Sequence, residues 1–216
     1  MWYDLTQPFH GEMPHSAMLP EPEFETVFDV KKDGINVQCY CAPTHVGTHV
    51  DAPLHFDPDG RTIDELPIER FHGEGVVLDV RQDEAREIQL EELQAAEGEV
   101  QAGDTVVLYT GWYHKYGDDD YDPYPWLAPE VADWLLEKEA GMLCVDTVSP
   151  DISYSIRPDD WDEYPIHKPL LQNDVLIAEH LTNLEPLLGE RIEIRAYPSK
   201  IRGGDGAPAR IVARPI

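Results

Sequence analysis

The segment Thr44-His45-Val46-Gly47-Thr48-His49-Val50-Asp51-Ala52-Pro53-Leu54-His55 is the most informative stretch of this chain. It places three of the nine histidines within eleven residues, with an aspartate among them. Neutral imidazole and carboxylate are the usual protein ligands of zinc, manganese and iron, and the segment has no cysteine to indicate a sulfur site. Histidines packed by chance would not gather in this way, so the segment predicts a metal site formed by His45, His49 and Asp51.

The backbone of this segment is expected to be extended, with one bend. Three β-branched residues alternate along it, and Pro53 prevents a continuing helix. The candidate side chains all occupy odd positions, so they face one side of an extended chain. A straight strand would separate His45 from His49 by about 13 Å, which is too far for one ion. Gly47 can supply the bend, and His55 is expected to stand beside the metal rather than among its ligands.

The segment resembles a family signature. Its residues from His45 to His55 match the pattern His-x-Gly-Thr-His-x-Asp-x-Pro-x-His of the cyclase-like metal-dependent hydrolases, which include bacterial kynurenine formamidase and isatin hydrolase. Tyr109-Thr110-Gly111-Trp112 resembles the strand end and following loop of that family, and Gly206-x-Pro208-x-Arg210 resembles its closing segment. The resemblance therefore covers nearly the whole chain.

The resemblance implies further metal ligands. In the two-metal formamidases of the family, a later histidine and a glutamate twelve residues beyond it complete the site, and His167 and Glu179 have this spacing. By resemblance, His45, His49 and Asp51 bind the first metal. A second metal would be bound by His167 and bridged to the first by Asp51 and Glu179. The ligand set suits zinc and manganese alike, so one or two divalent ions, Zn or Mn, are expected.

The residues alone support this second pair less strongly. Glu179 follows the apolar run 175–178, and a carboxylate at the end of a buried strand is well placed to enter a pocket. The alternative is that His167 only begins a helix and that Glu179 lies in a solvated loop.

Apolar runs separated by turn signals predict a mixed α/β fold. Runs at 75–80, 105–109, 142–145 and 175–178 are typical of strands buried on both faces, and 191–197 alternates like a half-exposed strand. Helices are expected over 129–141, over 90–96 and from about 165 to 173. Alternation of strands with helices favours α/β over a sandwich. The resemblance implies one mixed-sheet domain over 1–216, of the swivelling β/β/α type, that forms a homodimer or higher oligomer.

Cysteine usage gives no sign of a disulfide framework. The chain has three cysteines, and an odd number without framework spacing is unusual for a disulfide scaffold. Cys39 and Cys41 are interpreted as alternate buried thiols of a strand, since free cysteine behaves as a small apolar residue. The alternative, a metal-binding pair, is disfavoured.

Candidate substrate contacts come from aromatic segments. Residues 111–126 are rich in aromatics and acids without periodicity, which indicates either a functional loop or a solvated one. Trp112 could hold an aryl group by stacking. The same could hold for Trp2, Tyr3, Phe9, Tyr113 and Tyr116, unless these are ordinary core or interface residues. Formamidases of the family place an N-terminal tryptophan against the substrate. The corresponding position here is His15, which is taken as a substrate-binding candidate and departs from the pattern expected for N-formylkynurenine.

Charge limits the classes of partner. Forty-three acidic residues oppose 16 basic ones, for a net charge of −27. No basic patch for nucleic acid is visible, and no apolar run approaches the roughly 18 residues of a membrane span. The N-terminus lacks signal-peptide features, so a cytoplasmic location is expected. Acids spread over the whole chain favour a salt-rich cytoplasm over a basic partner, because a binding surface would be local.

The predicted function is hydrolysis of an amide-type C–N bond in a small molecule, such as an aryl formamide or a cyclic amide. A bound metal lowers the pKa of its water toward about 7 and acts as a Lewis acid. By resemblance His55 is general acid and base, and imidazole can pass the water proton to the leaving nitrogen. One alternative is a cyclase or lyase that uses the same site without adding water. Another is a non-catalytic metal-binding protein, which would need no base beside its ligands.

Overall fold

Eight strands form one sheet, which closes on itself because β4 pairs with β10 on one edge and with β12 on the other. The computed structural model describes residues 1–96 and 98–216. The strands run in the order β1-β12-β11-β5-β7-β9-β10-β4. Their bounds are β1 (Tyr3–Asp4), β4 (His49–Asp51), β5 (His72–Asp79), β7 (Thr105–Tyr109), β9 (Met142–Val145), β10 (Leu176–Glu179), β11 (Arg191–Pro198) and β12 (Gly206–Pro215).

The centre of the sheet is parallel and is buried on both faces. β5, β7, β9 and β10 pair in parallel, whereas the pairs that involve β4, β11 and β12 are antiparallel. Alternate residues of β5 and β7 face opposite ways: Val77 and Val107 join the core inside the closed sheet, and Val76 and Val106 join the core beneath the helices. This outer core is covered by α2 (Leu90–Ala95), α3 (Glu130–Glu137) and α4 (His167–Gln172).

The predicted elements are largely confirmed, as is the mixed α/β class. The strands at 105–109 and 142–145 have the predicted bounds, and the other three are shifted by one residue or extended. The three helices lie where they were expected. The remaining short elements are β6 (Glu87–Ile88), β8 (Trp126–Leu127), η1 (Pro53–His55), η2 (Ile68–Phe71), η3 (Trp112–Lys115) and η4 (Glu185–Leu187). No helix in the described ranges has both the length and the apolar character of a membrane span.

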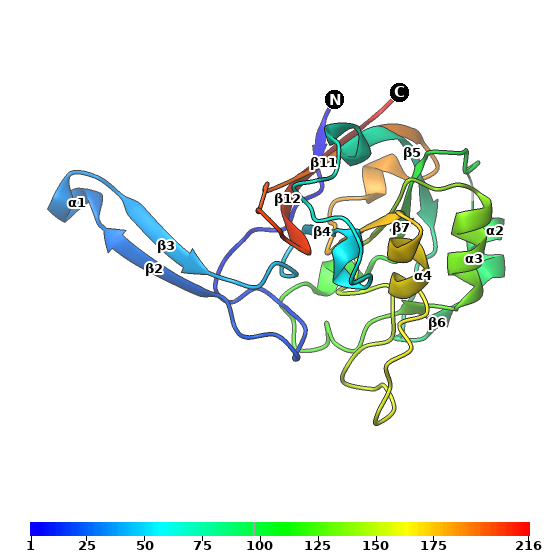
Figure 1. The fold of residues 1–216 in the computed structure, drawn as a ribbon, viewed down its shortest axis with the longest axis horizontal. Helices are drawn as coiled ribbons and strands as arrows, with labels where there is room; N and C mark the ends of the chain where they lie inside the picture. The colour runs from blue at the N-terminus through cyan, green and yellow to red at the C-terminus, as the bar shows by residue number, and fades with distance from the viewer. Residues whose placement is uncertain (97) are drawn as a thin grey trace.

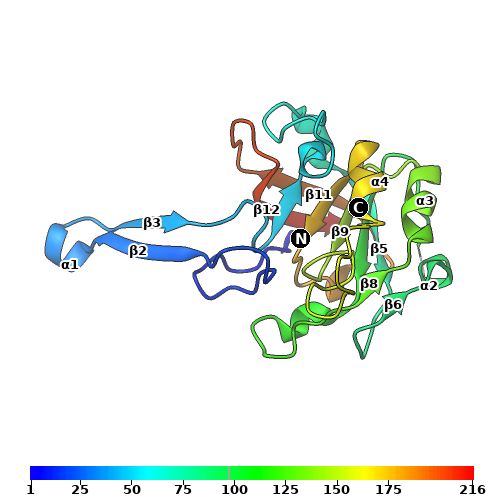
Figure 2. The ribbon, with the colours of Figure 1, turned by 60° about the horizontal axis from the view of Figure 1, so that its bottom comes forward.

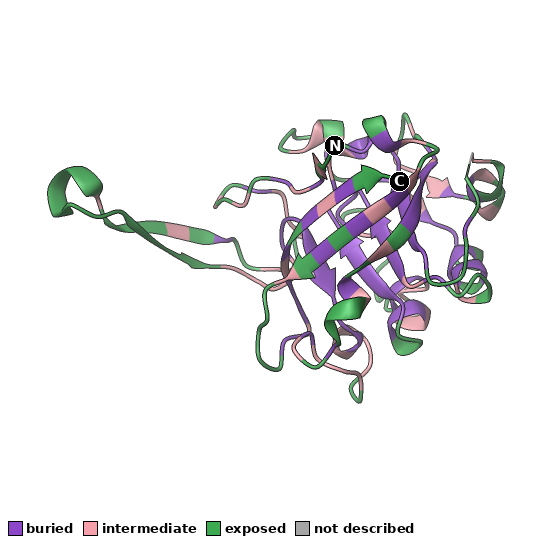
Figure 3. Cartoon of the chain, turned by 90° about the horizontal axis from the view of Figure 1, so that it is seen from above, coloured by how far each residue is buried: buried purple, intermediate pink, exposed green. Residues whose placement is uncertain are grey.

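A hairpin arm projects from the body of the molecule (Figures 1 and 2). It consists of β2 (Glu23–Phe28), α1 (Val30–Asp33) and β3 (Val37–Cys41). Residues of both strands are mostly exposed (Figure 3). The prediction that Cys39 and Cys41 are buried thiols is therefore wrong, although they do lie on a strand. The two strands contact each other and, through Phe24 and Tyr40, the ring of Phe9, but most of their side chains face solvent.

The aromatic segment 111–126 contributes a small core of its own. Trp112, Tyr121 and Tyr124 are buried together with Val148. The Trp112 indole Nε1–H donates to the carbonyl oxygen of Tyr121 at 2.8 Å. The aromatic part of the segment is thus packed, because its rings cover one another and its indole is hydrogen-bonded, whereas the acidic stretch 117–120 is exposed to solvent.

Candidate metal centre

The pairing of β4 with β10 brings three of the predicted ligands together. Glu179 lies directly opposite His49 in this antiparallel pair. His49 Nε2 is 3.2 Å from Glu179 Oε2 and 3.3 Å from Asp51 Oδ1. His49 and Asp51 are two residues apart on one strand, so their side chains share a face, while Val50 between them enters the core. All three ionisable groups are buried.

Gly47 makes the bend that the sequence required. Its φ is +59°, in the left-handed region that glycine adopts without a Cβ clash. As a result the rings of His45 and His49 lie 5.3 Å apart between centroids, rather than at the spacing of a straight strand. The Nδ1–H of His49 donates to the carbonyl oxygen of Gly47 at 2.7 Å, which directs its Nε2 into the site.

His167 enters the site from the first residue of α4. Its Nε2 is 3.2 Å from Glu179 Oε1 and 3.6 Å from Asp51 Oδ2. Its Nδ1–H donates to the Asp151 carboxylate at 2.5 Å, and Asp151 also accepts the backbone N–H groups of Ile166 and His167. A carboxylate behind a histidine is a common way to orient a metal ligand and raise its basicity. Asp151 lies between β9 and α4, sixteen residues before its partner, and no sequence signal marked it.

Several buried polar atoms of this cluster have no partner with hydrogen-bond geometry among the described residues, although oppositely charged groups lie 3.0 to 3.2 Å from three of them. The atoms without such a partner are Nε2 of His45 and His49, Oδ2 of Asp51 and Oε1 of Glu179. Unsatisfied buried polar atoms are costly, and convergent imidazole and carboxylate atoms are what a divalent cation would satisfy. The residues present therefore fit a metal ion. Candidate ligand atoms within 4.8 Å of one another form two groups that share Asp51, one with His45 and His55 and the other with His49 and Glu179.

The electrostatics of the cluster favour positive charge. Burial alone would lower the histidine pKa values, but the nearby Asp51 carboxylate raises the pKa of His45 to about 9 and that of His49 to about 10. For His45 the carboxylate of Asp205 adds to the effect, since its Oδ2 lies 3.0 Å from His45 Nε2. Conversely, these histidines hold the pKa of Asp51 well below its usual range, against the effect of burial.

His55 differs electrostatically from the histidines around it. Its ring stacks on that of His45, with centroids 3.8 Å apart, and stands edge-on to Phe56 at 4.6 Å. Burial, opposed by Asp51 but reinforced by His45 and His167, lowers the pKa of His55 to about 4. Its Nδ1 lies 3.9 Å from Asp205 Oδ2, beyond hydrogen-bond distance. His55 is therefore neutral near pH 7.

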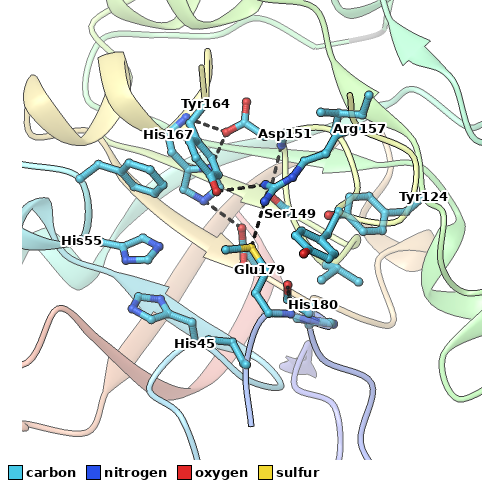
Figure 4. Close-up of a pocket in the computed structure, with 17 residues that line it drawn as sticks. His45, His55, Tyr124, Ser149, Asp151, Arg157, Tyr164, His167, Glu179 and His180 are labelled. Atoms are coloured by element: carbon cyan, nitrogen blue, oxygen red, sulfur yellow. Dashed lines mark hydrogen bonds and ion pairs between the residues drawn. The ribbon is translucent and has the colours of Figure 1, made fainter. Parts of the chain in front are cut away.

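A pocket opens beside this cluster. Figure 4 shows His45, His55, His167 and Glu179 facing it. Of the aromatic residues that line it, Tyr124 belongs to the aromatic segment 111–126, whereas the sequence did not single out Phe56, Tyr154 and Tyr164.

The two substrate candidates lie apart from this pocket. His15 lines an adjacent pocket that shares Tyr124 and Tyr154 with the first. Trp112 is buried behind Tyr121 and Tyr124 and lines neither pocket. None of the other five aromatic candidates lines either pocket; Trp2, for example, packs between Arg195 and Arg214.

Comparison with known proteins assigns the chain to a family. The Cyclase family model matches residues 3–152, which is more than half of the chain and includes the segment from His45 to His55. The chain belongs to the cyclase family. This confirms the resemblance seen in the signature.

Curated relatives span most or all of the chain. The kynurenine formamidase of Salinibacter ruber is 34% identical over 186 residues, which cover 85% of this chain and 82% of that protein. The kynurenine formamidase of Bacillus anthracis is 29% identical over 219 residues, which cover 100% and 98% of the two chains.

Solved structures show the same fold. Isatin hydrolase A from Ralstonia solanacearum superposes with a TM-score of 0.87 at 26% identity, over 99% of this chain and 91% of that one. A structure described as a "predicted metal-dependent hydrolase from Bacillus stearothermophilus" superposes with a TM-score of 0.78 at 26% identity, over 99% and 97%. With relatives of this kind along its full length, the chain is a hydrolase of the cyclase family.

Proposed function

We propose that this protein hydrolyses an amide-type C–N bond of a small aryl formamide or cyclic amide. The bond class follows from the names of its relatives, kynurenine formamidase and isatin hydrolase. The observation that carries the proposal is the set of buried nitrogen and oxygen atoms that converge without hydrogen-bond partners beside the neutral ring of His55.

Five side chains would hold the metal: His45, His49, Asp51, His167 and Glu179. They offer imidazole nitrogens and carboxylate oxygens, a set that suits one or two ions of zinc or manganese. Bound there, the metal would supply Lewis-acid polarisation of the carbonyl and a water of lowered pKa.

His55 would move the protons. Its ring stacks on that of His45, it lines the same pocket, and it is unprotonated near neutral pH. It can therefore accept the proton of the attacking water and pass it to the leaving nitrogen, which must depart protonated. The aromatic walls of the pocket, including Phe56 and Tyr124, would hold the apolar part of the substrate.

Substitution of His55 separates its role from that of the ligands. His55→Ala should retain bound metal but lose about 10²- to 10⁴-fold in kcat toward an aryl formamide. His49→Ala should lose both metal and activity, measured as metal per protein by elemental analysis and as turnover by product release. The exposed His72 on β5 provides the control variant His72→Ala, which should behave as wild type. Near-normal turnover by His55→Ala would disprove its role, and purified protein that neither contains nor responds to a divalent ion would disprove the site.

A further inference from the structure

Arg157 is an arginine without a carboxylate partner in the proposed substrate pocket. Seven of the ten arginines form ion pairs with Asp or Glu, whereas none of the ion pairs among the described residues includes Arg157. This is unusual in a chain with 43 acidic residues. Of the described lysines and arginines, Arg157 alone lines the pocket that also contains His45, His55 and Glu179.

Three aromatic rings surround the Arg157 guanidinium. Its Cζ lies 4.4 Å from the ring centroid of Tyr154, 5.2 Å from that of Trp161 and 5.7 Å from that of Tyr164. Stacking on rings orients a guanidinium while leaving its in-plane N–H groups available. Figure 4 shows the side chain reaching into the pocket, across from His45 and His55.

Most of the hydrogen-bonding capacity of Arg157 is unused. Nη1 donates to the Tyr164 hydroxyl oxygen at 3.0 Å, and Nη2 contacts the sulfur of Met18 at 3.3 Å. A guanidinium has five N–H donors, so donors remain for a planar anion. Thioether sulfur is a weak acceptor that an anion would readily replace.

The two acidic residues that line this pocket, Asp151 and Glu179, are already engaged. Asp151 accepts from the backbone N–H of Ile166 and from the backbone and ring N–H groups of His167. Glu179 faces His49 and His167. Neither carboxylate is therefore available to Arg157, so an anion from outside the chain would meet no competing acid of the pocket lining.

We propose that Arg157 is a specificity-determining residue that binds a carboxylate on the substrate. This inference rests on the proposed amide hydrolysis and narrows its substrate class to amides that also carry a carboxylate away from the scissile bond.

A chain of side-chain contacts links Arg157 to the candidate metal centre. Arg157 is hydrogen-bonded to Tyr164, the ring of Tyr164 packs on Phe56, and Phe56 stands against His55. A carboxylate on Arg157 would thus anchor one end of the substrate while the amide lies at the cluster. In a molecule of net charge −27, an anion would otherwise be repelled, so such an anchor is needed for this class.

Matched substrates test the inference. Formanilide is a neutral aryl formamide, and the ortho, meta and para formamidobenzoates add one carboxylate at three positions. Wild-type enzyme loaded with zinc or manganese should prefer at least one formamidobenzoate over formanilide by about tenfold or more in kcat/KM. Arg157→Gln should lower kcat/KM for that substrate by about 10- to 100-fold, mainly through KM, because a charge-assisted pair is lost. Its kcat/KM for formanilide, which has no carboxylate, should fall by much less.

Controls separate this role from a structural one. Arg202 is exposed and forms none of the ion pairs seen among the described residues, so Arg202→Gln makes the same charge change elsewhere and should have no effect. Arg157→Lys keeps the charge but not the fork of donors and should restore part of the preference. An equal loss for charged and neutral substrates in Arg157→Gln, or no loss for either, would overturn the proposal, as would a wild type without preference.

A binding measurement keeps the test independent of turnover. If neither a formamide nor a cyclic amide is hydrolysed, the proposed function fails, but calorimetric titration with the aminobenzoates still examines Arg157. Wild type should bind at least one aminobenzoate about tenfold or more tightly than Arg157→Gln does, with aniline bound equally by both. Equal binding of the aminobenzoates by the two proteins, or no binding by wild type, would refute the carboxylate site. Should Arg157→Gln fail to fold by circular dichroism, the comparison is made with Arg157→Lys.

Discussion

Gly206 matters to the candidate metal centre because no side chain would fit there, and not because its backbone conformation requires glycine. A Cβ at this position would lie 2.7 Å from Cε1 of His45 and 2.9 Å from the carbonyl oxygen of Val50. Real Cβ atoms do not make such contacts, and one of the two neighbours is backbone. The glycine of the closing motif therefore allows β12 to lie against the ring of a ligand.

Gly206→Ala should displace His45 and weaken metal binding. Overpacking of this kind costs about 1–3 kcal/mol, because the backbone or the imidazole must move. Zinc per protein after dialysis should fall, and the midpoint of urea unfolding should decrease. Gly73→Ala is the matched control, since a Cβ added at Gly73 would meet no atom within 4 Å and its φ is not in the left-handed region. Unchanged zinc content in Gly206→Ala would show that His45 does not need its present position.

Individual site residues were predictable only where they lie near one another in the sequence or follow a recognisable spacing. The segment from His45 to His55 and the bend at Gly47 could be read locally, because strand periodicity and glycine geometry are local properties. Asp151 and Asp205 could not, since each touches its histidine from a distant part of the chain. The one sequence feature that could have indicated Asp205 is its position directly before the motif that begins at Gly206.

At the scale of elements, α2 depends on one glutamate at its start. Glu92 accepts two hydrogen bonds from Arg86, at 2.9 and 2.6 Å, and one from the backbone N–H of Gln89 at 2.9 Å. This closes a capping box with Gln89. The Arg86 guanidinium, opposed by partial burial, lowers the pKa of Glu92 to about 2.

Glu92→Gln should destabilise the protein in a pH-dependent way. A carboxyl whose folded pKa lies below its unfolded value stabilises the fold above the unfolded value, near 4.5, and loses that contribution as pH falls through about 2. Urea unfolding at pH 7 should show a loss of about 1 kcal/mol, typical of a cap. The difference from wild type should shrink below pH 4.5. The exposed neighbour Glu91 gives the control Glu91→Gln, and a difference that stays constant from pH 7 to pH 3.5 would contradict the argument.

The elements of the body were more predictable than those outside it. Buried parallel strands such as β7 and β9 have continuous apolar runs, which follow directly from burial on both faces. The arm formed by β2 and β3 lacks such a run, because neither of its faces enters a core. β12 was missed because it carries prolines and charges, with exposed positions alternating along part of its length.

At the scale of the whole molecule, the arm is the part that the chain itself leaves uncovered. It exposes large apolar side chains, including Phe28, Ile35 and Tyr40, which are 43%, 55% and 59% accessible. An isolated two-stranded hairpin is at best marginally stable in water. The oligomer expected from the family resemblance would explain this, if a second copy covers the arm.

Substitution in the arm should therefore shift the oligomeric state. Ile35→Glu would place a charge in the proposed contact between the arm and a second copy. Light scattering coupled to gel filtration should then show a lower mass than for wild type at the same concentration. Ile68→Glu is the control, because Ile68 is equally exposed, at 57%, but lies on the body in η2. A wild type that is monomeric at micromolar concentration would rule out this explanation of the arm.

The net charge of −27 sets a second property of the whole molecule, its response to salt. Like charges spread over one surface repel each other, and the Debye length falls from about 10 Å at 0.1 M salt to about 3 Å at 1 M. The melting temperature should therefore rise as KCl increases from 0.1 M to 2 M. The double variant Asp118→Asn, Asp119→Asn removes two charges from an exposed run and should show a smaller rise. The alternative is that the acidic residues serve one basic partner, in which case screening of charge by salt would matter little for stability. Wild type would then be fully stable in dilute buffer, and molar KCl would not raise its melting temperature.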